Sequence, residues 1–96
     1  MNAGDEFQFN QAQYDLDETK SKLKEYLKVT YSSPEEAEST YRYLEKIVSR
    51  ICKRQEYTLN FRGGSPAWHA HILQLLGKWV HLENKVGILM AKELNS

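Results

Sequence analysis

The chain has 96 residues and a mass of 11.2 kDa, which suits one domain and leaves no room for a second hydrophobic core. Its residues are 41% hydrophobic and 27% charged, an ordinary globular usage that excludes a collagen-like or wholly disordered chain. Thirteen basic and thirteen acidic residues give a net charge of zero, which argues against a general polyanion binder. So short a chain has little stability to spare for a deep catalytic cavity, and we expect a binding surface instead.

The N-terminal segment is predicted to be a loose arm followed by a helix. Residues 1–9 are polar apart from Phe7 and Phe9, which we expect to dock the arm onto the rest of the domain. Asn10 is a favourable N-cap, and a helix is predicted from about Gln11 to Val29. Its buried stripe follows the helical period and consists of Ala12, Leu16, Leu23 and Leu27, with Thr19 and Thr30 between them.

The second predicted helix has the clearest start signal in the sequence. Ser33 is a good N-cap, Pro34 occupies the first turn where its missing N–H costs nothing, and Glu36 follows three residues after the cap. We expect this helix to end near Glu56. Its inward stripe consists of Ala37, Tyr41, Leu44, Val48 and Ile51.

An extended connector is predicted over residues 57–64. Tyr57, Leu59 and Phe61 alternate with polar residues at period two, and the Gly63-Gly64 pair then interrupts the chain. A lone strand is not stable unpaired, so we expect this connector to pack against the helices through its side chains.

The third predicted helix begins with Ser65 and Pro66 and continues to about Glu93. Its seam recurs at alternating steps of three and four residues and consists of Trp68, Ile72, Leu75, Trp79, Leu82, Val86 and Leu89. The predicted fold is an all-α antiparallel three-helix bundle in a single helical domain, residues 1–96. A break at Gly77 would give four helices instead.

The third helix also carries a second face of small and apolar residues, turned well away from the tryptophan seam. Its members are Ala70, Leu73, Gly77, Val80, Asn84, Gly87 and Ala91. A monomeric three-helix bundle buries one face of each helix, so we expect this face to pack against another helix, either a fourth segment or the same helix of a second subunit. Together with the tyrosines off the buried stripes, Tyr14, Tyr26 and Tyr43, it forms our set of candidate protein-interface residues.

Charge is unevenly distributed along the sequence. Residues 1–45 hold ten acidic and five basic side chains, whereas residues 46–96 hold eight basic and three acidic ones. This asymmetry indicates either an anion-binding half or two halves that attract each other within a bundle or a dimer.

A candidate anion or nucleic-acid surface surrounds the loop before the third helix. Arg62, the two glycines and Ser65 bring a guanidinium, a hydroxyl and free N–H groups to a helix N-terminus, although a plain loop-to-helix junction has the same composition. Basic and aromatic residues interleave on either side, as binding to a single-stranded nucleic acid requires. The candidates are Arg50, Lys53, Arg54, Arg62, Gly64, Ser65, His69, His71, Lys78 and Lys85.

No catalytic, metal or cofactor constellation is predicted. His69 and His71 are two residues apart and point in nearly opposite directions on a helix, and Cys52 lies beside an apolar stripe with no orienting group evident. The single cysteine, the acidic start of the chain and the lack of a long apolar run favour a cytoplasmic protein without a secretion signal. We therefore expect a non-enzymatic interaction protein that forms a homodimer and modulates a larger partner by occlusion or bridging; the alternative is a nucleic-acid-binding accessory protein.

Overall fold

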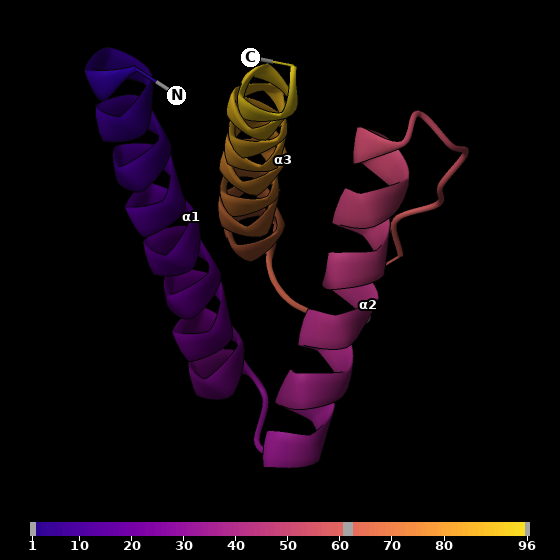
Figure 1. Cartoon of the computed structure of the whole chain (residues 1–96). Coiled ribbons are helices and arrows are strands. Elements are labelled where there is room, and N and C mark those ends of the chain that lie inside the picture. The colour runs from indigo at the N-terminus through magenta and orange to yellow at the C-terminus, as the bar shows by residue number, and fades with distance from the viewer. Residues whose placement is uncertain (1, 61–62, 96) are drawn as a thin grey trace.

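The computed structural model describes residues 2–60 and 63–95, and its regular elements are three helices (Figure 1). They are α1 (Ala3–Thr30), α2 (Pro34–Cys52) and α3 (Pro66–Leu94), packed against one another with no strand among the described residues. The all-helical prediction is confirmed. The three helices form an elongated body of 47 × 26 × 23 Å.

Helix α1 begins at Ala3, so the predicted loose arm at residues 1–9 and the N-cap at Asn10 are wrong. Asn2 is the N-cap instead, and its Oδ1 accepts a hydrogen bond from the Asp5 backbone N–H at 2.7 Å. Acidic residues in the first turn favour a start there, since they lie at the positive end of the helix dipole. Phe9 packs against the core from within the helix, which gives this first part of α1 a tertiary contact.

Helix α2 begins at Pro34 with Ser33 as its N-cap, as predicted. The Ser33 hydroxyl accepts from the Glu36 backbone N–H at 3.3 Å and donates to the Glu35 carboxylate at 2.8 Å. That hydrogen bond lowers the pKa of Glu35. The carboxylate that bonds the Ser33 hydroxyl is therefore that of Glu35. The capping-box spacing indicates the next residue, Glu36.

The C-terminus of α2 lies at Cys52, four residues before the predicted end, because a left-handed turn terminates the helix. Arg54 has φ of 57°, and the backbone N–H of Gln55 donates to the Arg50 carbonyl at 2.8 Å. A second bond from the Arg54 N–H to the Ile51 carbonyl completes the pairing of a Schellman motif. Arginine thus occupies the position at which glycine is usual.

Replacing Arg54 with glycine is expected to stabilise the fold by about 1 kcal/mol, because glycine adopts a positive φ without the steric cost that a Cβ imposes. For a domain of this size that gain corresponds to a rise in Tm of roughly 5 °C. The measurement is thermal unfolding followed by circular dichroism. Arg54→Ala is the matched control, since it removes the same side chain and keeps the strained φ; an equal gain from alanine would contradict the backbone explanation.

Helix α3 is continuous from Pro66 to Leu94, so the alternative of a break at Gly77 is wrong. Ser65 is its N-cap, as predicted, and the Ser65 Oγ accepts from the Trp68 backbone N–H at 3.1 Å. All seven residues of the predicted tryptophan seam are buried, and Leu76 joins them. This helix packs against both α1 and α2.

The helices do not alternate in direction throughout, as a fully antiparallel bundle would require. In Figure 1, α1 runs opposite to both of its neighbours, whereas α2 and α3 run in the same direction. The connector after α2 returns alongside that helix: the Tyr43 hydroxyl donates to the Thr58 carbonyl at 2.8 Å and accepts from the Asn60 N–H at 2.9 Å. Helix α3 then begins beside the end of α1, where Trp68 Nε1 donates to Thr30 Oγ1 at 2.6 Å.

The core is centred on Trp79 of α3, which is almost fully buried. Its ring lies 5.5 Å from that of Tyr41 on α2, nearly parallel to it, and the Lys20 ammonium of α1 lies 5.5 Å from the Trp79 ring centroid. Trp79 Nε1 donates to the Glu83 carboxylate at 3.2 Å. All three helices therefore meet at this one side chain.

Candidate interaction surfaces

The loop before α3 has a structural reason for its glycines and serine. Gly64 has φ of 83°, and a Cβ built at this position would lie 2.6 Å from Cε3 of the Trp68 ring. The Ser65 hydroxyl caps α3, and the ring of His69 hydrogen-bonds the Gly63 carbonyl at 2.8 Å. Three of the predicted anion-binding residues, Gly64, Ser65 and His69, thus serve the junction itself.

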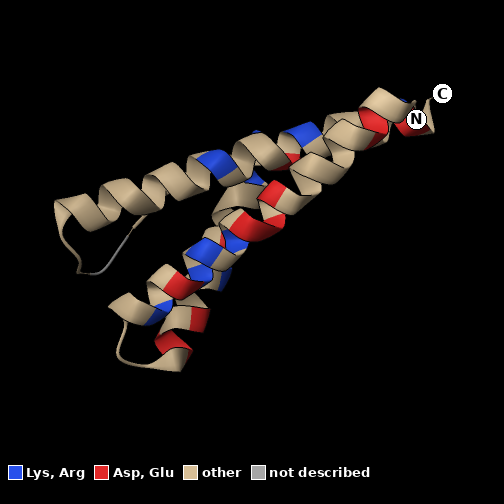
Figure 2. Ribbon diagram, turned by 90° about the vertical axis from the view of Figure 1, so that its left-hand side faces the viewer, with Lys and Arg blue, Asp and Glu red and all other residues tan. Residues whose placement is uncertain are grey.

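The remaining basic candidates are distributed over different parts of the molecule. Arg50, Lys53 and Arg54 lie at the C-terminal end of α2, whereas the loop before α3 lies near the opposite end of α2, because the two helices run in the same direction. Lys78 and Lys85 are exposed along α3, and Arg62 lies outside the described residues. Figure 2 shows basic and acidic residues interspersed along the helices. The predicted surface over residues 50–71 is therefore divided.

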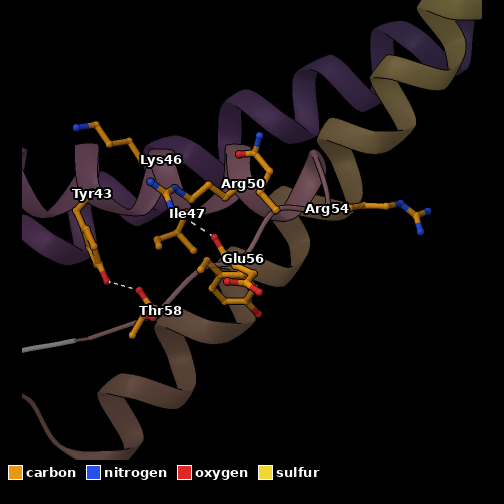
Figure 3. A pocket seen from close by; sticks show the side chains of 9 residues that line it. Tyr43, Lys46, Ile47, Arg50, Arg54, Glu56 and Thr58 are labelled. Carbon is orange, nitrogen blue, oxygen red and sulfur yellow. Dashed lines mark hydrogen bonds between the residues drawn. The ribbon is translucent and has the colours of Figure 1, made fainter.

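A shallow groove of about 810 Å³ separates the end of α2 from the connector (Figure 3). It is lined by Lys46, Arg50 and Arg54, with Tyr43 and Tyr57 beside them. The Arg50 guanidinium donates to the Glu56 carbonyl at 3.3 Å, so it holds the connector in place. In Figure 3 the Lys46 and Arg54 side chains extend away from this contact in different directions. The three cations therefore do not converge on one point.

The three candidate tyrosines differ in their surroundings. Tyr14 is exposed on α1, and Tyr43 is half-buried because its hydroxyl holds the connector. Tyr26 is also half-buried, with its ring 4.4 Å from that of His71 and 6.5 Å from that of Trp68. Of these three tyrosines, only Tyr14 has an exposed ring without such a structural contact.

The second face of α3 remains largely uncovered by the described residues. Leu73 is half exposed, Ala70, Asn84 and Ala91 are exposed, and a Cβ built at Gly77 or Gly87 would have nothing within 4 Å. Val80 is the exception, since it is partly buried against the core. The small residues of this stripe therefore do not mark a helix contact within the described chain.

An apolar groove between α1 and α3, of about 590 Å³, was not predicted from the sequence. Tyr26 and Val29 line it from α1, and His71 and Leu75 line it from α3. Val29 is 84% exposed, although it is a large aliphatic residue. Charged residues of both signs, Glu18, Lys22 and Glu25, border the groove on α1, and Lys22 pairs with Glu18 at 3.1 Å. An apolar floor with a polar rim is the usual composition of a protein-binding surface.

The groove is lined by residues that no sequence pattern connects. Val29 stands at the predicted end of the first helix and off its buried stripe, while His71 lies off the tryptophan seam. Each looks unremarkable in its own helix. Their proximity follows from the antiparallel pairing of α1 and α3, which brings the end of one helix beside the beginning of the other.

Cys52 lies next to a small cavity lined also by Trp79 and Glu83. Burial raises the pKa of the Cys52 thiol, and the Glu83 carboxylate raises it further. The thiolate fraction at neutral pH is therefore lower than for a free cysteine, which is the opposite of nucleophile activation. Across residues 2–60 and 63–95, no three histidine, cysteine or acidic side chains form a group with metal-binding geometry.

The chain matches no family model, no curated protein and no solved structure. Among the described residues, no helix combines the length and the apolar character needed to cross a membrane.

Proposed function

We propose that this chain is a non-enzymatic helical interaction protein that docks onto a larger protein partner and modulates it by occlusion or bridging. The observation that carries the proposal is the apolar groove between α1 and α3, which is lined by Val29 with 84% of that residue exposed. Exposing a large aliphatic side chain beside other apolar groups gains nothing for the fold, and a partner that covers it removes the apolar surface from water.

The chemistry of the groove favours an amphipathic helical segment of the partner. Two neighbouring helices present a furrow into which a third helix lays its apolar residues, spaced three and four apart. The Tyr26 and His71 rings, with centroids 4.4 Å apart and planes tilted by 53°, offer an aromatic contact in this groove. Lys22 and Glu25 on the rim suit a segment that carries charges of both signs flanking its apolar stripe.

The test is site-specific photo-crosslinking in extract of the native cell. A benzophenone amino acid at position 29 is expected to give a defined protein adduct, identified by mass spectrometry, that excess unlabelled wild-type protein competes away. Excess Val29→Lys protein is expected not to compete, because an ammonium in the lining of the groove opposes its burial beneath the partner. Since Val29 is already exposed, this variant should keep the stability of the wild type.

The matched control carries the same benzophenone at position 39, since Ser39 is exposed on α2, away from the groove. The proposal is overturned if positions 29 and 39 give the same adducts, or if the Val29→Lys protein competes as well as the wild type. Neither outcome can be attributed to misfolding when circular dichroism shows equal helix content.

A further inference from the structure

The three helices differ in length, so one end of the molecule has only two of them. α1 has 28 residues and α3 has 29, but α2 has 19. The end of α2 lies beside Glu83, since Cys52, Lys53 and Glu83 line one cavity. Residues 84–94 of α3 continue beyond it for about 16 Å at the helical rise per residue. Both chain termini lie at this two-helix end (Figure 1).

The face of α3 that turns toward α2 becomes exposed where α2 ends. Leu76, Glu83 and Met90 lie seven residues apart and so share one face of the helix. Leu76 is 4% exposed and Glu83 lies at the end of α2, whereas Met90 is 51% exposed. Leu94, four residues further along the same face, is 84% exposed. The apolar face thus continues past the helix that covers it.

Beyond the end of α2, the space beside residues 84–94 of α3 is left open by α2, and we call it the gap. The same seven-residue spacing identifies the side of α1 that faces it. Glu6, Gln13 and Lys20 lie seven residues apart. Lys20 lines the cavity at the end of α2 and pairs with Glu83 at 3.5 Å. Glu6 therefore stands on the gap side near the tip, opposite Met90 and Leu94 on α3.

The charges at the two limits of the gap are opposite in sign. The tip of α1 carries Asp5 and Glu6 in its first turn. The end of α2 carries Arg50, Lys53 and Arg54. Within the part of the chain that the structure describes, Glu6 and Lys53 belong to no ion pair. A molecule that enters the gap with an acidic tip leading would bring that tip beside the basic end of α2.

We propose that a second copy of this chain fills the gap. The two-helix ends of the two copies lie side by side about a two-fold axis and form a four-helix bundle that covers Met90 and Leu94. The Glu6 tip of each copy then reaches Lys53 of the other, and a two-fold axis makes both contacts at once. The inference deepens the proposed function. It rests on that function only in taking the chain to act through protein contacts, because the Val29 groove is a separate surface.

Sedimentation equilibrium of the wild-type chain at tens of micromolar is expected to give twice the chain mass of 11.2 kDa. The double variant Met90→Asp with Leu94→Asp is expected to weaken the dimer by at least about tenfold, since it places two carboxylates in the buried interface. Phe7→Asp is the matched control: Phe7 is equally apolar and exposed at the same end, but it lies about 100° around α1 from Glu6. It should leave the mass unchanged.

A charge exchange tests the orientation of the two copies. Glu6→Lys and Lys53→Glu are each expected to weaken the dimer about fivefold, and the protein with both changes is expected to recover wild-type affinity. A monomer mass for the wild type, dissociation by Phe7→Asp but not by the Met90 and Leu94 changes, or failure of the combined exchange to recover would each overturn this arrangement. Crosslinking from position 29 would be unaffected by such a failure, and Val29→Lys should leave the dimer intact, so the two proposals fail separately.

Discussion

Replacing Trp79 with alanine is expected to lower the free energy of unfolding by about 3–5 kcal/mol, which is a large part of the total stability of a domain of this size. The indole is 2% exposed and contacts all three helices. Its loss removes the stacking on Tyr41, the Lys20 contact and the hydrogen bond to the Glu83 carboxylate. The cavity that remains lies at the meeting point of the bundle, where no single helix can shift to close it.

Urea unfolding followed by circular dichroism measures this effect as a fall in the transition midpoint at unchanged slope. Trp79→Phe is the matched control, because it keeps an aromatic ring beside Tyr41 and removes mainly the Nε1 donor. It is expected to cost about 1–2 kcal/mol. If alanine cost no more than phenylalanine, Trp79 would not be the packing centre that the structure indicates.

The helix starts that depend on local chemistry are the part of the fold that sequence reasoning predicts well. Ser33-Pro34 and Ser65-Pro66 each combine a capping hydroxyl with a proline in the first turn, and both helices begin there. The tryptophan seam of α3 is equally local, since its spacing defines one face whatever packs on it. Each of these features is decided by residues within a few positions of one another.

The start of α1 shows where local rules give more than one answer. Asn2 and Asn10 are equally suitable caps, and the segment between them has helical potential but few apolar residues. The helix is capped by Asn2, and Phe9 packs against the core from within it. Local pattern alone does not carry that information.

The direction of α3 and both interaction surfaces depend on contacts that are distant in sequence. The Tyr43 hydroxyl joins residues fifteen and seventeen positions away, and these bonds hold the connector alongside α2 so that α3 begins near the end of α1. This arrangement separates Arg54 from His69, which the sequence places in one basic region, and brings Val29 to His71, which the sequence does not connect. The path of the connector thus separates residues that the sequence groups together and brings together residues that it does not connect.

Replacing Gly64 with alanine is expected to cost about 2–3 kcal/mol, the second largest effect of a single substitution considered for this chain. Two terms contribute: a positive φ of 83°, and a Cβ that would lie 2.6 Å from the Trp68 ring. That ring cannot withdraw easily, because it is 7% exposed, lies 6.2 Å edge-on to Tyr31 and donates its Nε1 hydrogen bond to Thr30.

Gly63 provides a control that separates the two terms. It has a similar φ of 73°, but a Cβ there would meet nothing within 4 Å, so Gly63→Ala is expected to cost only about 1 kcal/mol. The difference between the two alanine variants in urea unfolding measures the contact with Trp68. Equal losses would show that the Trp68 ring does not require Gly64 and that the positive φ alone accounts for both glycines; a larger loss at position 64 assigns that glycine to the packing of Trp68.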